Sequence, residues 1–252
     1  MSGYSFDKAE ETDSLYIAFA GPIGSGKTTL SQIIAEALGA VFVPEKINPE
    51  ANPFLERFYA EKSYQRDAEK SGQQTLINQP YPLATWSMAT ELSFLCQRVD
   101  LMRDINALLA TGRSVVSDWV PAQNLVFSQL TLTEDEFRLY ESLYVRLLDS
   151  VRNPDLIVCL EADLDTLIAR IKKRGREMET ELAADYLKAL SRGYGRWKIE
   201  PPGPIVWVPT DKLYLETPTD KQRVAKKFME YLSEFRNGRQ RGDLFISHEL
   251  AI

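Results

Sequence analysis

The strongest constraint on this chain is the segment Gly21-Pro-Ile-Gly-Ser-Gly-Lys-Thr28, which fits the pattern G-x-x-x-x-G-K-[ST] at every defined position. A short apolar run at 15–20 precedes the segment, and apolar residues at helical spacing follow it at 30–38. Glycines there allow backbone torsions that direct successive N–H groups at an anion, and the start of the next helix adds partial positive charge. A glycine turn with a surface lysine is the alternative interpretation, but the strand–loop–helix context favours a loop that binds the phosphates of a nucleoside triphosphate.

The residues predicted to contact the triphosphate belong to this loop and the first helical turn after it. They are Gly21, Gly24, Ser25, Gly26, Lys27, Thr28 and Thr29. Lys27 is expected to reach the outer phosphates, and the hydroxyl of Thr28 to bind Mg²⁺. The motif alone does not separate kinases from GTPases, ATPases or motors. Because the sequence has no N-K-x-D string for guanine nucleotides and no extra domains of a motor, it favours a small-molecule kinase that uses ATP and Mg²⁺.

Beyond the loop, short apolar runs alternate with segments of helical periodicity. The runs expected to be strands are 15–20, 40–43, 114–117, 156–160 and 205–208. The segments expected to be helices are 30–38, 83–110, 133–151, 164–171 and one that opens at Thr219. This alternation predicts an α/β fold of three layers, in which a five-stranded parallel sheet is flanked by helices as in P-loop kinases.

The length of 252 residues and the absence of an internal repeat or clear linker predict one domain over residues 1–252. Within it, 1–13 is expected to be a flexible lead, the polar segment 61–80 an insertion, and 237–252 a tail.

Composition excludes several classes of function. The net charge of −6 argues against a nucleic-acid polymer as partner, and no apolar run approaches the length of a membrane helix. The polar, acidic start is not a secretory signal, so a cytoplasmic protein is expected. Cys96 and Cys159 each lie in an apolar run, which predicts two buried free thiols. Since the only histidine is His248, carboxylates are expected to do the acid–base work.

Glu45 is the first candidate carboxylate. It lies just past the second predicted strand, and the carboxyl ends of parallel strands face the ligand crevice. A carboxylate at that place can accept or orient the proton of an acceptor hydroxyl. A solvated loop residue is the alternative interpretation.

Basic residues gather at 170–180, where a predicted helix runs into a glycine-containing loop. Arg170 and Arg174 are four residues apart and share a helix face, and Arg176 follows Gly175. Such a segment is typical of a lid that closes over phosphates, although cations at the end of a helix are also favoured by its dipole. Together with the phosphate-binding loop, the lid interpretation is preferred.

The chain resembles the deoxyribonucleoside kinase family, in particular bacterial deoxyadenosine and deoxyguanosine kinases, over roughly residues 15–235. The resemblance rests on pieces that follow one another in the family's order. These are Gly21–Thr28, Glu45, Asn52-Pro-Phe-Leu-x-x-Phe58-Tyr59, the helix from Trp86 to Arg98, Asp118 after the third strand, and Arg170-Ile-x-x-Arg174-Gly-Arg176 with Glu179.

The resemblance implies a role for each of several residues in phosphoryl transfer. Glu45 is implied to be the base toward the 5′-hydroxyl of the sugar. Asp118 is implied to support Mg²⁺ together with Thr28. The lid arginines Arg170, Arg174 and Arg176 are implied to hold phosphates.

The resemblance also implies contacts to the nucleoside, and a homodimer as the assembly. Glu179 would hold the 3′-hydroxyl with Tyr59, or with Tyr81 if the inserted segment shifts the alignment. Arg98 would lie beside the base and near Glu45. Trp86 is a further candidate substrate contact, with core packing as its alternative.

Three positions depart from the family's pattern. Trp119 follows Asp118 where the family has an arginine, Glu91 stands where it has a glutamine, and Asn124 where it has an aspartate. Glu91, Arg98 and Asn124 are therefore the expected base-reading residues. The alternative for Glu91 is a solvent-facing position or an ion pair on the helix surface, and the alternative for Asn124 is a helix cap or turn.

The sequence thus predicts ATP-dependent phosphorylation of a deoxyribonucleoside, with a purine or modified base preferred. Two alternatives remain. One is a kinase for a nucleoside monophosphate or another small hydroxyl compound. The other is a non-catalytic binding module with the same fold, which the Asp118-Trp-Val string keeps open.

Overall fold

The computed structural model describes residues 14–47, 50–59, 85–148, 151–176, 179, 182, 184–241 and 247–250. The predicted lead at 1–13, the predicted insertion at 61–80 and Tyr81 lie outside these residues.

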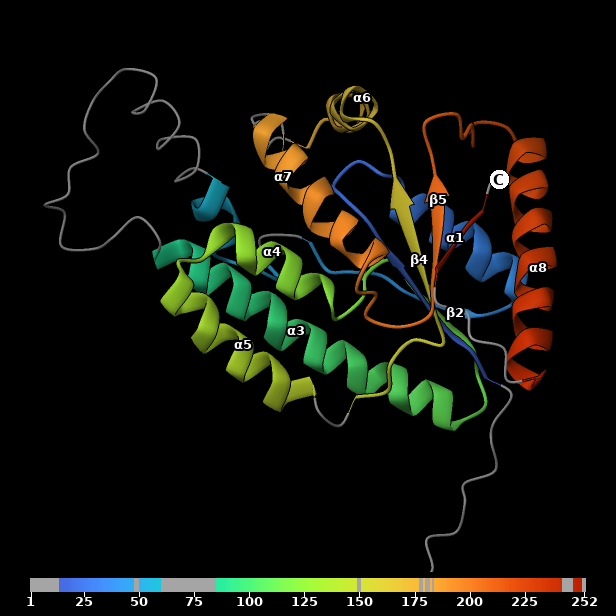
Figure 1. Ribbon diagram of the computed structural model, residues 1–252, viewed down its shortest axis with the longest axis horizontal. Coiled ribbons are helices and arrows are strands. Elements are labelled where there is room, and N and C mark those ends of the chain that lie inside the picture. The colour runs from blue at the N-terminus through green and yellow to red at the C-terminus, as the bar shows by residue number, and fades with distance from the viewer. Residues whose placement is uncertain are drawn as a thin grey trace, which may run out of the picture.

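A parallel sheet forms the centre of the fold (Figure 1). Its six strands lie in the order β2-β3-β1-β4-β5-β6. The strands are β1 Tyr16–Ala20, β2 Val41–Val43, β3 Val115–Ser117, β4 Leu156–Glu161, β5 Ile205–Pro209 and β6 Ser247–Glu249. The five strands predicted from the sequence are all present, and the α/β fold class is confirmed. Because all strands are parallel, their carboxyl ends share one edge, where ligands bind in such sheets.

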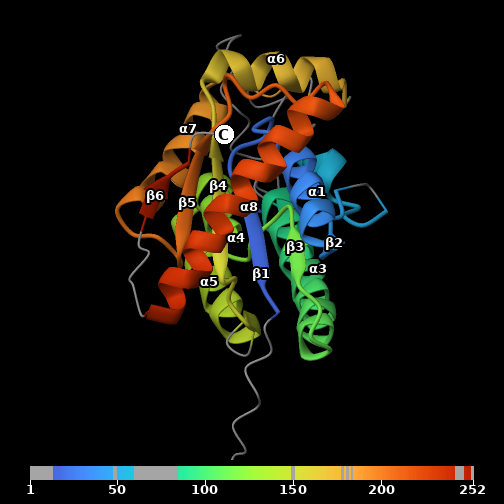
Figure 2. The ribbon, with the colours of Figure 1, turned by 90° about the vertical axis from the view of Figure 1, so that its right-hand side faces the viewer.

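Helices cover both faces of the sheet. They are α1 Lys27–Leu38, α3 Thr85–Ala110, α4 Gln123–Thr131, α5 Glu134–Leu148, α6 Leu164–Arg174, α7 Ala184–Gly195 and α8 Pro218–Arg241. Helices α1 and α8 lie on one face, and α3, α4 and α7 on the other, with α5 packed outside α3 and α4. Helix α6 crosses beyond the carboxyl ends of the strands (Figure 2). None of the described helices is long and apolar enough to span a bilayer.

Strand β1 shows how the sheet supplies two cores. Tyr16 and Ala18 point to the face covered by α3 and α7, whereas Ile17 and Phe19 point to the face covered by α1 and α8. All four side chains are fully buried. Side chains alternate between the faces of a strand, so a strand covered on both sides is apolar at every position. This continuous apolar pattern is what allowed the strand to be predicted.

Two helix starts are fixed by side-chain caps. Before α5, Thr133 and Glu136 form a capping box: Glu136 accepts a hydrogen bond from the backbone N–H of Thr133 at 2.9 Å, and the Glu136 N–H donates to the Thr133 hydroxyl. The last helix begins at Pro218 rather than at the predicted Thr219. Thr217 caps this helix together with Asp220. Pro218 suits the first helical position, because no N–H is needed there.

The structure corrects the expectation that residues 237–252 form a tail. Helix α8 continues to Arg241, and residues 247–249 form β6, which pairs in parallel with Ile205–Trp207 of β5. The sequence Ser-His-Glu of this strand contains no apolar run, so the pattern that predicted the other strands was absent.

The two cysteines differ in environment. Cys159 on β4 is buried, as predicted, and burial raises the pKa of its thiol. Cys96 on α3 is exposed, so the prediction of a buried thiol was wrong there. Neighbouring positions on a helix are rotated by about 100°. Leu95 therefore faces the core while Cys96 faces outward.

Candidate active site

The loop at 21–28 connects the end of β1 with the start of α1, as the motif predicted. Gly21 and Gly24 have φ angles of 134° and 85°, which favour glycine. A Cβ atom at Gly21 would lie 2.4 Å from the backbone oxygen of Leu160, and one at Gly24 would lie 2.9 Å from that of Leu167. The loop is thus pressed against β4 and α6, and only glycine fits these two positions.

Lys27, the first residue of α1, folds back over this loop. Its ammonium group donates to the backbone oxygens of Gly21 at 2.8 Å and Pro22 at 3.0 Å. Burial lowers the pKa of Lys27, and the nearby charges of Glu45 and Asp118 oppose that shift. The ammonium is therefore held at the mouth of the loop, where phosphates would lie.

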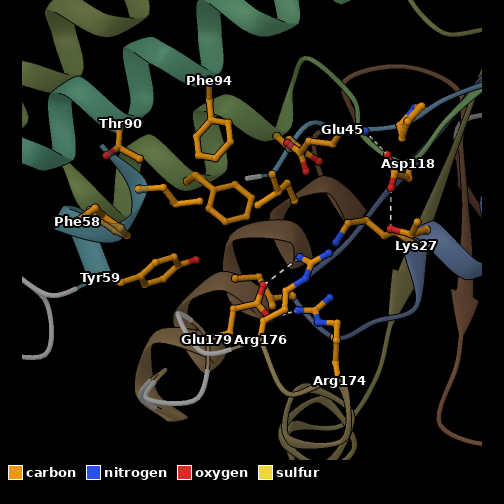
Figure 3. A pocket seen from close by; sticks show the side chains of 18 of the residues that line it. Lys27, Glu45, Phe58, Tyr59, Thr90, Phe94, Asp118, Arg174, Arg176 and Glu179 are labelled. Atoms are coloured by element: carbon orange, nitrogen blue, oxygen red, sulfur yellow. Dashed lines mark hydrogen bonds and ion pairs between the residues drawn. The ribbon is translucent and has the colours of Figure 1, made fainter. Parts of the chain in front are cut away.

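Asp118 follows β3 and joins two parts of the site. Its Oδ2 accepts a hydrogen bond from the Thr28 hydroxyl at 2.6 Å, and its Oδ1 accepts one from the backbone N–H of Glu45 at 2.6 Å (Figure 3). Burial raises the pKa of the Asp118 carboxyl, and the two hydrogen bonds oppose that shift. One carboxylate thus connects the start of α1 with the chain that follows β2.

Glu45 is held from the side of helices α3 and α4. Arg98 of α3 forms an ion pair with its Oε1, and the Gln123 amide of α4 donates to the same oxygen at 3.1 Å. The side chains of Arg98 and Glu45 are only 5% and 9% exposed. Burial lowers the pKa of Arg98, but the charge of Glu45, the influence of Tyr140, the hydrogen bond to Glu45 and the charge of Glu91 together outweigh burial, and the net shift is upward. Glu45 is thus a fixed carboxylate inside the site.

The predicted lid arginines do not lie together. Arg174 and Arg176 both line the cavity and pair with Glu179, whose side chain is 5% exposed. Arg170 donates instead to Thr210, reaching its hydroxyl at 2.9 Å and its backbone oxygen at 2.5 Å. Arg170 therefore fastens α6 to the loop after β5, and the structure places it outside the cavity lining.

A cavity of about 360 Å³ joins these groups to an apolar end. The aromatic residues that line it are Phe58, Tyr59, Phe94, Phe127 and Tyr186. In Figure 3, Phe58, Tyr59, Thr90 and Phe94 lie at the end opposite Lys27. Burial raises the pKa of the Tyr59 hydroxyl, and the charge of Glu179 adds to that shift. The cavity thus has a charged end and an aromatic end.

The three expected base-reading residues occupy different places. Glu91 and Arg98 line the cavity, and Glu91 accepts a hydrogen bond from the Thr131 hydroxyl at 2.8 Å. Asn124 is fully buried behind Arg98, accepts a hydrogen bond from it, and donates to the Tyr140 hydroxyl at 2.7 Å. The structure thus places Asn124 as a support for Arg98.

Trp86, the further candidate contact, lies outside the cavity lining. Its ring stacks on Phe54 with centroids 6.0 Å apart, and the guanidinium of Arg57 lies 4.5 Å from its centroid. Trp86 thus fixes the helical residues 55–59 against α3, and through them the position of Tyr59.

Comparison with known proteins decides the family. The sequence model of the deoxynucleoside kinases matches residues 17–235. The chain belongs to the deoxynucleoside kinase family. It is accordingly a phosphotransferase.

Individual relatives of this kinase support the same family assignment. A deoxyguanosine kinase from Bacillus subtilis strain 168 is 31% identical over 180 residues, which cover 71% of this chain and 76% of the relative. A deoxyadenosine kinase from Lactobacillus acidophilus is 27% identical over 233 residues, 88% of this chain and 98% of the relative. The solved deoxyadenosine kinase from M. mycoides with bound dCTP shares the fold, with a TM-score of 0.65, 20% identity, and coverage of 87% of this chain and all of that one.

Trp119 occupies the position where the family has an arginine. The indole is fully buried and belongs to the core cluster that includes Val120, Tyr194 and Trp197. It packs under α7 and lies outside the cavity lining. The departure is thus a core substitution.

Sequence reasoning missed Gln123, which bonds Glu45, and Thr131, which bonds Glu91. Both lie on α4, a helix that was not predicted. For Gln123 a signal existed, because it directly precedes Asn124 after the third strand.

Proposed function

We propose that this kinase transfers the γ-phosphoryl group of ATP to the 5′-hydroxyl of a deoxyribonucleoside, giving a 5′-monophosphate and ADP. The observation that carries the proposal is the pair of hydrogen bonds at Asp118. They connect Thr28 of the phosphate-binding loop with the backbone of Glu45. Donor and acceptor groups thereby face one cavity at a fixed spacing, and such positioning supplies much of catalysis in phosphoryl transfer.

The donor end would hold ATP through the amides of the loop and through Lys27. The ammonium group, now bonded to backbone oxygens of its own loop, would exchange them for phosphate oxygens. The oxygens of Thr28 and Asp118 fit Mg²⁺, which prefers one or two protein oxygen ligands next to substrate phosphates. When bound, the ion neutralises charge on the phosphates.

At the acceptor end, Glu45 is the proposed base. Its carboxylate would accept the proton of the 5′-hydroxyl as that oxygen bonds to the γ-phosphorus and the bond to the bridging oxygen of ADP breaks. Arg98 and Gln123 both contact Oε1, so they fix the carboxylate for this step.

Arg174 and Arg176 would stabilise the transferring group. Both lie on the cavity wall at the charged end and are paired with Glu179. Glu179 and Tyr59 are proposed to hold the 3′-hydroxyl, and the proposal is supported by the place of both side chains in the lining of the same cavity (Figure 3).

An uncharged acceptor suits the other end better than a monophosphate does. Arg98, the cation that a monophosphate would need, is already engaged with Glu45 and Asn124. The lining there is largely aromatic. Relatives named for deoxyguanosine and deoxyadenosine support a purine.

We also propose that the kinase is a homodimer, as the family resemblance implies. Leu139 and Val145 on the outer side of α5 are more than half exposed, which gives an apolar surface for a second copy. Light scattering after size exclusion tests this, and a monomer at micromolar concentration would contradict it.

The reaction is tested by ADP release from ATP with each deoxynucleoside and each deoxynucleoside monophosphate, with identification of the product. We expect ADP and a 5′-monophosphate with at least one nucleoside. Turnover of monophosphates alone would favour the alternative acceptor, and no turnover at all would contradict an enzymatic role.

A further inference from the structure

A carboxylate lies in the wall of the cavity at its aromatic end. Glu91 of α3 is 4% exposed and lines the cavity together with Thr90 and Phe94 of the same helix. Thr90 and Phe94 lie at the end opposite Lys27 (Figure 3). Since the phosphates would lie at Lys27, the base of a bound nucleoside would lie near Glu91.

The Glu91 carboxylate is oriented by a neighbouring helix. Thr131 at the end of α4 is buried, and its hydroxyl donates to Oε1 of Glu91 at 2.8 Å. An ionised carboxylate accepts hydrogen bonds at about four lone-pair sites and donates none. Thr131 therefore helps to fix the orientation of the group.

Glu91 shares the wall of the cavity with aromatic side chains. Phe94, Phe127 and Tyr186 also line the cavity and provide aromatic surface for a base. The charge of Glu91 contributes to the raised pKa of Arg98, a second charged residue of the same wall. A nucleobase placed there would meet an oriented acceptor in a largely apolar slot.

The common bases differ in what they present to such an acceptor. Guanine offers two adjacent donors, N1–H and the 2-amino group, which match the two oxygens of a carboxylate. Adenine and cytosine each offer an amino group beside a ring nitrogen whose lone pair would face the second oxygen and repel it. Thymine offers one N–H between two carbonyl oxygens. A glutamine, with one donor and one acceptor, would suit adenine or cytosine instead.

We infer that Glu91 selects guanine, so that the nucleoside of the proposed reaction is deoxyguanosine. The inference rests on the proposed function, because it assigns the base of the same nucleoside. Glu91 reads N1–H and the 2-amino group, and Thr131 is a positioning residue that orients the carboxylate. Charge-assisted hydrogen bonds of this kind are stronger than neutral ones, and a base that lacks the pair of adjacent donors does not form both of them.

The test compares kcat/KM for deoxyguanosine, deoxyinosine, deoxyadenosine and deoxycytidine in the wild type and in Glu91→Gln. We expect the wild type to prefer deoxyguanosine over deoxyadenosine by about 100-fold, with deoxyinosine in between because it lacks the 2-amino group. Glu91→Gln should lower the ratio for deoxyguanosine over deoxyadenosine by about 100-fold, by lowering the first rate and raising the second. The control is Asp104→Asn, which removes an exposed carboxylate from the same helix and should leave the ratio unchanged.

The outcomes separate the inference from the proposed function. A wild type that prefers another base, or a Glu91→Gln ratio equal to that of the wild type, overturns the assignment of guanine while the kinase reaction stands. A wild type that phosphorylates no nucleoside overturns the proposed function itself. If Glu91→Gln fails to fold, the wild-type ratio of deoxyguanosine to deoxyinosine decides, since a ratio near one excludes a reading of the 2-amino group.

Discussion

The two ends of the cavity are built in different ways. At the phosphate end, the loop at 21–28 and the lid pair Arg174 and Arg176 come from short, continuous segments, and the backbone supplies much of the chemistry. At the base end, Glu91, Arg98 and the residues that hold them come from three helices, and side chains supply all of the chemistry.

This difference accounts for two of the three departures from the family pattern, Glu91 and Asn124. A backbone loop tolerates little change, because a Cβ atom at Gly21 or Gly24 would clash with β4 or α6. A network of side chains can be exchanged position by position while the helices stay in place. We therefore expect changes at the phosphate end to reduce the rate with every nucleoside, and changes at the base end to alter the order of preference.

The largest effect is expected for Lys27→Ala. Removing the ammonium from the mouth of the loop should lower kcat about 1,000-fold or more, because the charge that develops on the phosphates loses its nearest cation. The fall should be equal for all nucleosides, as measured by ADP release. Lys46→Ala, at an exposed lysine nearby, is the matched control and should keep full activity. A changed base preference in Lys27→Ala would show that the phosphate end also contributes to the choice of base.

Glu45→Gln should lower kcat by about 100- to 1,000-fold, the usual contribution of a general base. Affinity for ATP should stay nearly unchanged, because the hydrogen bond from Glu45 to Asp118 comes from the backbone N–H, which the substitution leaves in place. Steady-state kinetics together with calorimetric titration of ATP separate the two quantities. Full turnover in this variant would show that the base is another group.

Gln123→Leu removes one of the two groups that hold Glu45. We expect kcat to fall about 10-fold with KM and base preference unchanged, the size of one hydrogen bond. Gln129→Leu, on the exposed side of the same helix, is the control and should have no effect on kcat. A shift in preference among nucleosides would instead place Gln123 at the base end.

The smallest effect concerns stability away from both ends. Asp220 caps α8 through Thr217, and this hydrogen bond holds the pKa of the Asp220 carboxyl below its usual value. A lowered pKa in the folded state means that the stabilisation is present above the ordinary carboxyl pKa and is lost as the pH falls. Asp220→Ala should thus lower Tm slightly at pH 7, less at pH 4, and leave kcat unchanged. An equal Tm difference at both pH values would show that the cap acts without its charge.

The fold could be predicted from the sequence where the local pattern of apolar residues is strong. Strands β1, β4 and β5 were predicted because burial on both faces makes their sequence continuously apolar. Helices α4 and α7 were missed, and in α4 the polar residues Gln123, Asn124 and Ser128 are buried, which interrupts the apolar pattern. The edge strand β2 was predicted from its apolar sequence Val41–Val43, whereas the other edge strand, Ser247–Glu249, is polar and was missed.

The site could be predicted only in part, because sequence spacing gives the position of a residue but not the direction of its side chain. Spacing placed Lys27, Thr28 and Glu45 correctly at the carboxyl edge of the sheet, and all three line the cavity. Spacing did not show which way Arg170 turns at the end of α6, nor that Asn124 stands behind Arg98. Those directions depend on how separate elements pack, which a single sequence does not reveal.

The shared carboxylate of Asp118 has a consequence for motion. Both the first turn of α1 and the chain after β2 form a hydrogen bond with this one carboxylate. A thermal displacement of the loop therefore carries the Glu45 backbone along with it. The separation between the two reactants varies less than the position of either one, so their alignment survives fluctuations that move the whole edge of the sheet.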